Sequence, residues 1–265
     1  MKRDGVNILS LFVLITLFAC KTNKHSVITV WLIGDSTVAD YTQYGNYETE
    51  RFPVTGWGQV FQQFMNGAYR DSLANLLQAD SVMVDDRARG GRSTRTFFQE
   101  GRWRAVYESL KPGDWVLIQF GHNDAAENKP ERYVDPEGYK EFLRLFVSQS
   151  LQNGAMPVLL TPVARNYPWK DGVLTNVHGV YPDAVKEVAE ELSVPLIDLN
   201  RLSMDFFTSK GETYSTTHYF MNLPAGKYVA YPDGQHDNTH FQPEGAQEVA
   251  KLVYHGLQKI ANQRN

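Results

Sequence analysis

The sequence contains a single cysteine, Cys20, and this scarcity removes two kinds of architecture. One cysteine cannot form an intramolecular disulfide, and a zinc site built from several cysteines is equally excluded. The chain also lacks internal repeats and any stretch rich in proline, glycine or serine that would divide it. With 265 residues, of which 42% are hydrophobic, one globular domain with a large core is the simplest organisation.

Long apolar runs and an excess of positive charge are lacking as well. The apolar run over residues 8–18 has eleven residues, whereas a helix that spans a bilayer needs about 20. The formal net charge is −4, and it becomes −5 when residues 1–19 are left out. This balance argues against a general nucleic-acid binder.

The N-terminal segment is typical of a signal for export. Lys2 and Arg3 precede the apolar run, which predicts a signal peptide over residues 1–19. The run ends in Leu-Phe-Ala-Cys at residues 17–20, which resembles the lipobox of bacterial lipoproteins, in which the cysteine is acylated and becomes the new N-terminus. We therefore expect a lipid on Cys20 and a protein anchored to the outer membrane or in the periplasm. The alternative is an ordinary signal peptide, a free cysteine and a secreted protein.

After a short tether over residues 20–27, we predict one domain over residues 28–265. Apolar runs without alternation predict five strands that are buried on both faces, at residues 28–33, 81–84, 115–120, 157–161 and 195–199. Apolar residues at helical spacing follow, notably over 139–147 and 246–257. Strands that alternate with helices indicate a parallel sheet covered on both faces, with ligands bound beyond the carboxyl ends of the strands.

Polar or glycine-rich blocks follow three of these strands. Residues 34–37 (Gly-Asp-Ser-Thr) place Ser36 at the sheet edge, at the expected start of a helix, where backbone N–H groups favour negative charge, although a helix cap is equally typical. Gly91 can present its N–H to an oxyanion or simply form a turn. Asn123, in a Gly-His-Asn-Asp block, is a neutral N–H donor or part of an Asx turn.

A fourth block precedes the final helix, which Pro243 is expected to begin. Asp237 and His240 are separated by about one helical turn, so the carboxylate can orient the imidazole. Such a pair is most often structural. His236 and His240 are four apart, as two metal ligands on one helix would be, but no glutamate follows His236, which disfavours a metal hydrolase.

In this order, the four blocks resemble those of the GDSL, or SGNH, hydrolases. Longer stretches, Gly-Asp-Ser-Thr-Val-Ala-Asp-Tyr at 34–41 and Asp-Asn-Thr-His-Phe at 237–241 among them, are similar to the rhamnogalacturonan acetylesterase branch, carbohydrate esterase family 12. The resemblance covers the chain after residue 27. It implies a flavodoxin-like α/β/α sandwich with a five-stranded parallel sheet. The chain has no Gly-x-Ser-x-Gly elbow, which argues against the α/β-hydrolase solution to the same chemistry.

The resemblance also implies roles. Ser36 would be the nucleophile, His240 the general base and then acid, and Asp237 the residue that orients it. The backbone N–H groups of Ser36 and Gly91 and the amide of Asn123 would form the oxyanion hole, with no metal or cofactor. The expected reaction removes acetyl groups from rhamnogalacturonan. The alternatives are another acetylated glycan such as xylan, a lipid or thioester substrate, or a surface glycan-binding lipoprotein without turnover.

Arginine is dense in one segment of this acidic chain. Six arginines lie between residues 87 and 104, and guanidinium groups match carboxylates such as those of galacturonate. We expect Arg92 and Arg95, which follow Gly91, to contact substrate, and Trp169, in the loop after the fourth strand, to stack on a sugar. The alternative is that nearby acidic residues neutralise these arginines in structural pairs.

Overall fold

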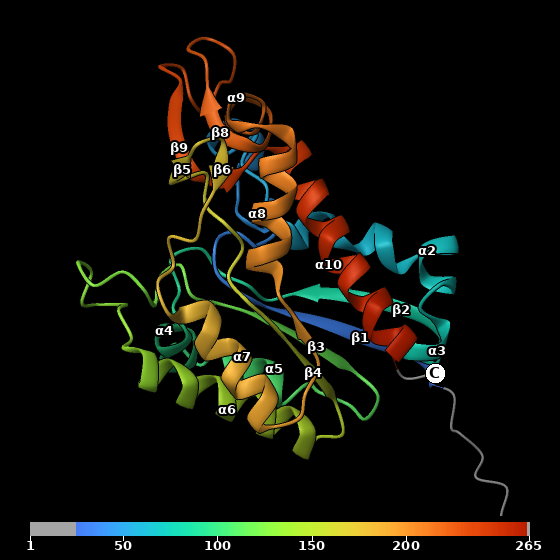
Figure 1. The fold of residues 1–265 in the computed structure, drawn as a ribbon. Helices are drawn as coiled ribbons and strands as arrows, with labels where there is room; N and C mark the ends of the chain where they lie inside the picture. Colours follow the sequence, from blue (N-terminus) through green and yellow to red (C-terminus); the bar gives the residue numbers. More distant parts are fainter. Residues whose placement is uncertain (1–24, 264–265) are drawn as a thin grey trace, which may run out of the picture.

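A five-stranded parallel sheet forms the centre of the computed structural model, which describes residues 25–263 (Figure 1). The strands lie in the order β2-β1-β3-β4-β7, the doubly wound order of flavodoxin-like folds. Their bounds are β1 (His25–Gly34), β2 (Ala79–Asp86), β3 (Trp115–Gln119), β4 (Met156–Leu160) and β7 (Leu196–Ile197). The five predicted strands and their parallel arrangement are confirmed.

Burial on both faces explains the continuous apolar character of the strands. In β1, Val30 and Leu32 pack on one side of the sheet, Trp31 and Ile33 pack on the other, and all four are at most 5% exposed. β1 starts earlier than predicted, because His25 already pairs with Ala79 of β2. Residues 25–27 therefore belong to the sheet and not to the tether predicted over 20–27, since strand pairing uses backbone groups and does not require apolar side chains.

Helices cover both faces of the sheet. One face carries α4 (Thr94–Gln99), α5 (Arg102–Tyr107), α6 (Pro136–Gln152) and α7 (Tyr181–Glu191). The other carries η2 (Gly58–Met65), α3 (Ala74–Leu77), α8 (Leu199–Lys210) and α10 (Pro243–Gln263). The predicted apolar faces of α6 and α10 are largely buried, and α10 begins at Pro243 as expected.

Short elements complete the fold. They are η1 (Tyr41–Gln43), α1 (Tyr47–Glu50), α2 (Gly67–Asp71), α9 (Glu212–Tyr214), the π-helical turn η3 (Ser215–Tyr219), and the antiparallel pairs β5 (Trp169–Lys170) with β6 (Val173–Leu174) and β8 (Phe220–Leu223) with β9 (Gln235–Phe241). The two antiparallel pairs lie together beyond one edge of the main sheet (Figure 1). This position allows residues late in the chain to reach the ends of β1 and β3.

None of the helices within residues 25–263 has both the length and the apolar character needed to cross a bilayer. Cys20 and the predicted signal peptide lie outside the described residues, so the lipid anchor stays a prediction.

Candidate active site

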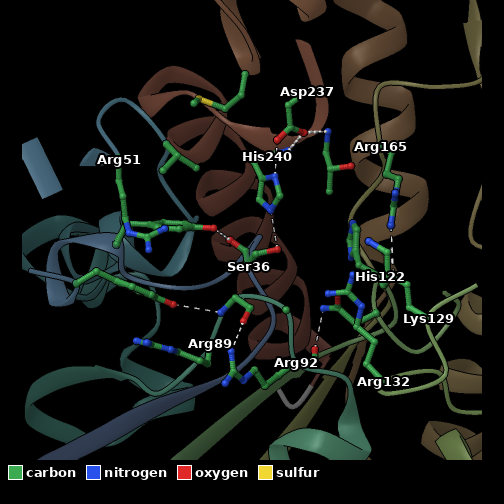
Figure 2. A pocket seen from close by; sticks show the side chains of 18 of the residues that line it. Ser36, Arg51, Arg89, Arg92, His122, Lys129, Arg132, Arg165, Asp237 and His240 are labelled. Atoms are coloured by element: carbon green, nitrogen blue, oxygen red, sulfur yellow. Dashed lines mark hydrogen bonds and ion pairs between the residues drawn. The ribbon is translucent and has the colours of Figure 1, made fainter. Parts of the chain in front are cut away.

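A cavity of about 620 Å³ lies at the carboxyl ends of β1, β2 and β3 (Figure 2). Its lining includes all five residues that the sequence motifs single out as catalytic groups or oxyanion donors: Ser36, Gly91, Asn123, Asp237 and His240. Because β1 is flanked by β2 and β3, the segments that follow these three strands meet at one place. The location agrees with the rule that ligands bind beyond the carboxyl ends of parallel strands.

Ser36 lies in a single turn directly after β1. The amides of Val38 and Ala39 donate to the carbonyl of Asp35, and the chain then leaves the helical path. The sequence predicted a helix start here, which is wrong: the carboxylate of Asp35 accepts from the backbone N–H and the hydroxyl of Thr37 and closes a local turn. Ser36 is therefore presented by a tight turn, without the dipole of a following helix.

A buried network holds this turn against the sheet. The side-chain amide of Gln119, at the end of β3, donates to the Thr37 hydroxyl at 2.7 Å and accepts from the Trp57 indole at 2.8 Å. Gly34 makes this approach possible, since a Cβ at that position would lie 2.6 Å from the carbonyl oxygen of Gln119. The motif over residues 34–37 is thus a packing requirement as well as the segment that carries Ser36.

Asp237 and His240 lie on β9, and not on the helical turn that their spacing suggested. Pairing along the β8–β9 hairpin slips between Phe220 and Met221, so that Phe220 pairs with Phe241 while Met221 pairs with Asp237. The extra residues of β9 form a turn in which one Asp237 carboxylate oxygen, Oδ1, accepts from the amides of Thr239 and His240. This irregular strand brings both side chains to the same side, as a regular strand would not.

The three polar side chains form an unbroken line of hydrogen bonds (Figure 2). Asp237 Oδ2 lies 2.6 Å from His240 Nδ1, and His240 Nε2 lies 2.8 Å from Ser36 Oγ. Burial raises the pKa of Asp237, but hydrogen bonds from the His240 ring and from the amides of Thr239 and His240 outweigh it and hold the pKa at about 2. Asp237 is therefore ionised at neutral pH and accepts the Nδ1 proton, which leaves Nε2 free to take a proton from Ser36.

Two further groups line the cavity beside Ser36. A Cβ built on Gly90 would lie 3.6 Å from Ser36 Cβ, so the glycine pair runs directly along Ser36. Gly91 has a φ of +81°, a conformation that a residue with a side chain rarely adopts. Asn123 donates one amide hydrogen to the carbonyl of Arg92 at 2.9 Å, which fixes its orientation and leaves a second N–H on the same nitrogen for a ligand.

Comparison with known proteins agrees with this arrangement. The model of the GDSL-like lipase/acylhydrolase family matches residues 32–248. The chain belongs to this family. It is a carboxylic ester hydrolase with the SGNH fold. It is 39% identical over 233 residues to the rhamnogalacturonan acetylesterase RhgT of Bacillus subtilis strain 168. These residues are 88% of this chain and 90% of RhgT.

Two further similarities extend the comparison. YesY of the same organism, named a probable rhamnogalacturonan acetylesterase, is 38% identical over 232 residues, which are 87% of this esterase and 93% of YesY. The crystal structure of YxiM from Bacillus subtilis superposes with a TM-score of 0.70 at 26% identity. That match covers 89% of this chain but 57% of the YxiM chain.

Of the three side chains that the sequence predicts to bind substrate in this esterase, only that of Arg92 lines the described cavity. Arg92 lines the cavity, but its guanidinium is held by the Glu100 carboxylate at 3.0 Å and by the carbonyl of Gly90 at 2.8 Å. Arg95 and Trp169 are absent from the described lining. Arg95 donates to the carbonyls of residues 130 and 133, and the half-buried Trp169 donates to the Asn166 carbonyl. Pairing with nearby acidic residues, the alternative for this arginine-dense segment, therefore applies to Arg92, as it does to Arg87 and Arg102.

Other cations line the cavity of the esterase, and the sequence motifs did not identify them as a group. They are Arg51, Arg89, Lys129, Arg132 and Arg165. Arg51 and Arg89 lie over the Tyr44 ring, at 4.7 and 3.9 Å from its centroid. Arg165 lies in the segment that follows β4, so the rule that ligands bind beyond the carboxyl ends of parallel strands points to it. Lys129 and Arg132 lie in an irregular segment after β3, and no local sequence pattern marks them.

A buried acid–imidazole pair lies beneath Ser36. His122 Nδ1 is 3.3 Å from Asp35 Oδ2, and both side chains are at most 2% exposed. Burial lowers the pKa of His122, so the positive charge of the cavity comes from guanidinium and ammonium groups.

His236 lines a separate cavity near β8, apart from His240. Within residues 25–263, no group of three or more His, Cys, Asp or Glu side chains is placed to hold a metal ion.

Proposed function

We propose that this esterase removes acetyl groups from acetylated rhamnogalacturonan, with Ser36, His240 and Asp237 as its catalytic triad. The observation that carries the proposal is the continuous line of hydrogen bonds from Asp237 through His240 to Ser36 in a cavity that also holds oxyanion donors. The relatives RhgT and YesY bear the name of this activity and align over nearly the whole chain.

The proposed reaction has two halves. His240 Nε2 takes the Ser36 proton while Oγ attacks the acetyl carbonyl, and the C–O bond to the sugar breaks as His240 returns the proton to the leaving hydroxyl. In the second half, the same nitrogen takes a proton from water as the water oxygen attacks the acetyl carbonyl. The bond to Ser36 Oγ then breaks while His240 returns the proton to Oγ, and acetate is released. In both halves the tetrahedral oxyanion accepts from the N–H groups of Ser36 and Gly91 and from the Asn123 amide. This chemistry uses no metal or organic cofactor.

The lining of the cavity supports a polar substrate with a short acyl group. Arginine and lysine side chains surround the triad, together with Tyr41, Tyr44 and Tyr231, and few aliphatic side chains contribute. A long acyl chain would need an apolar channel, because burying its methylene groups provides the binding energy. A glycan instead offers hydroxyl and carboxylate groups to these donors.

Acetate release from acetylated rhamnogalacturonan, homogalacturonan and xylan, measured side by side, tests the proposal. We expect the highest kcat/KM on rhamnogalacturonan and complete loss of release in Ser36→Ala. A preference for xylan would overturn the substrate assignment. A Ser36→Ala variant with wild-type hydrolysis of 4-nitrophenyl acetate would overturn the triad and support a glycan-binding protein without turnover. Faster hydrolysis of octanoyl than acetyl esters would favour a lipolytic enzyme.

We also propose that the protein is exported and carries a lipid on Cys20. The support is the charged start, the eleven-residue apolar run and the lipobox-like residues 17–20. Metabolic labelling with an alkyne fatty acid should label the wild type but not Cys20→Ser, and the variant should leave the membrane fraction. A Cys20→Ser protein that stays in that fraction would contradict the anchor.

A further inference from the structure

Three cations stand together on one side of the triad, where two cavities meet. Lys129, Arg132 and Arg165 line the active-site cavity and also a neighbouring cavity of about 370 Å³. Asn123, the proposed oxyanion donor, lines both cavities as well. Figure 2 shows the three cations on the side of Ser36 opposite to Arg51 and Arg89. We call Lys129, Arg132 and Arg165 the cationic cluster.

The cluster lies close to the reacting atoms. Nη1 of Arg132 is 3.5 Å from the point where a Cβ on Gly91 would stand. The Arg132 guanidinium is therefore next to Gly91, whose N–H is another proposed oxyanion donor. Arg165 donates to the carbonyl of His122, the residue before Asn123. A group bound to the cluster would therefore belong to the acetylated sugar or to its immediate neighbour.

These cations have almost no acidic partner in the described part of the chain. Among residues 25–263, the one carboxylate within 4 Å of them is that of Glu131, at 3.8 Å from Arg132 Nε. That distance is too long for a hydrogen bond, and the Nε atom is buried and has no hydrogen-bond partner. Within the described residues, the guanidinium of Arg165 donates only to the hydroxyl of Tyr167 and the carbonyl of His122.

Three arginines of the segment over residues 87–104, by contrast, have close acidic partners. Glu100 pairs with both Arg92 and Arg102. Arg87 pairs with Asp85. A buried guanidinium nitrogen without an acceptor is costly, and three cations that share one wall repel one another. A bound anion would relieve both effects, so the site is electrostatically complementary to a carboxylate.

The backbone that carries Lys129 and Arg132 is held in place before any ligand arrives. Arg95 on α4 donates to the carbonyls of Pro130 and Tyr133, on either side of Arg132. The carbonyl of Lys129 accepts from the amides of residues 132 and 133, and the Tyr181 hydroxyl donates to the carbonyl of residue 134. This segment is therefore already ordered in the folded protein, so the binding of a ligand costs less conformational entropy. Arg95, expected to contact substrate, is in this view a positioning residue.

We propose that the cationic cluster is a subsite for the carboxylate of a uronic acid unit that carries the acetyl group or adjoins the unit that does. The inference builds on the proposed function, because it assumes a glycan substrate in the active-site cavity. Arg132 offers a planar pair of donors to the carboxylate oxygens, and Lys129 and Arg165 add charge from two sides. The subsite would make the esterase select acidic over neutral glycans.

Inhibition of 4-nitrophenyl acetate hydrolysis tests the subsite without requiring turnover of a polysaccharide. The inhibitors are deacetylated rhamnogalacturonan oligosaccharides as free acids and as methyl esters, which keep the shape and lose the charge. We expect the free acid to have an inhibition constant about tenfold lower than the ester at low salt, and this ratio to shrink as salt rises. The ratio within each variant does not depend on its basal rate.

The ratio should fall to near one in Arg132→Gln and by several-fold in Lys129→Gln, whose exposed side chain can be removed without loss of folding. Arg104→Gln, an exposed arginine on α5 that does not line the described cavity, should leave both ratio and basal rate unchanged. An unchanged acid preference in both Lys129→Gln and Arg132→Gln, or no preference in the wild type, would overturn the subsite. Failure to release acetate from rhamnogalacturonan, with the acid preference intact, would instead count against the proposed function alone.

Discussion

Replacing Asp237 by asparagine tests the part that we propose for its carboxylate in catalysis. Oδ1 of Asp237 accepts two backbone amides, while Oδ2 faces His240 Nδ1. In Asp237→Asn the amide oxygen must take the Oδ1 position, because an NH₂ group there would meet two donors. The NH₂ group then donates to Nδ1, and the imidazole carries its proton on Nε2. That nitrogen faces Ser36 Oγ at 2.8 Å and can no longer accept the hydroxyl proton.

The size of the loss follows from the same contacts. The pKa of Asp237 is held at about 2 instead of 3.8, which corresponds to about 2 kcal/mol in favour of the carboxylate. Burial acts in the opposite direction, so the contacts with the His240 ring and with the amides of Thr239 and His240 together supply at least this much stabilisation of the carboxylate. In the asparagine variant the charge-assisted hydrogen bond to Nδ1 is lost, at a cost of about 1.5–3 kcal/mol, and the forced tautomer also removes the proton acceptor. Together these losses lower kcat by on the order of 10³ to 10⁴.

Hydrolysis of 4-nitrophenyl acetate at pH 7, with thermal unfolding to verify that the variants are folded, measures this loss. Asp237→Ala is the matched control, because it removes the carboxylate without imposing a tautomer. We expect Asp237→Asn to be no more active than Asp237→Ala. If the asparagine variant keeps more than about a tenth of the wild-type kcat, or far exceeds the alanine variant, the tautomer argument fails.

Three further predictions concern the same site. Asn123→Ala should lower kcat on an aryl acetate by on the order of 10² to 10³ with a smaller change in KM, and near-wild-type turnover would remove Asn123 from the oxyanion hole. Gly34→Ala should lower the free energy of unfolding in urea by about 1–3 kcal/mol, because the new Cβ meets the Gln119 carbonyl. The control is Gly45→Ala, which has open space around it and should change this free energy by less than about 0.5 kcal/mol. Equal effects of the two substitutions would contradict this packing. The pKa of Asp237 in the folded protein lies below its ordinary value, so its contribution of about 2 kcal/mol to the free energy of unfolding is present above pH 4 and is lost as the pH falls toward 2. Between pH 5 and pH 2 the wild type should therefore lose about 2 kcal/mol more unfolding free energy than Asp237→Asn. Equal losses in the two proteins would contradict the lowered pKa.

Local patterns were sufficient for most of the architecture. Apolar runs such as that of β3 predicted all five strands of the sheet, because a strand buried on both faces needs no polar position. Helical spacing located α6 and α10, and Pro243 marked the start of α10. The strand-end rule placed Ser36, Gly91 and Asn123 at one edge, since parallel strands end on the same side.

Inference from local patterns failed where a long-range contact overrides a local preference. The turn at Ser36 does not continue as a helix, because Asp35 closes it and Gln119 anchors it from another strand. Asp237 and His240 lie on β9 because β8 pairs with that segment, and a shift in pairing supplies the turn. Spacing along the chain describes both arrangements equally well, so it cannot choose between helix and bulged strand.

The amino-acid sequence by itself determined the five strands, the helices α6 and α10 and the identity of the residues that meet at the sheet edge. Each of these depends on hydrophobic periodicity or on a few consecutive residues. Only the tertiary structure decided which cations remain available to a ligand. Arg92 is paired with Glu100 and Arg95 with backbone carbonyls, while Arg132 and Lys129, from a segment without a recognisable motif, line the cavity. The availability of a charge depends on every partner that folding brings near it, and no stretch of sequence contains that information.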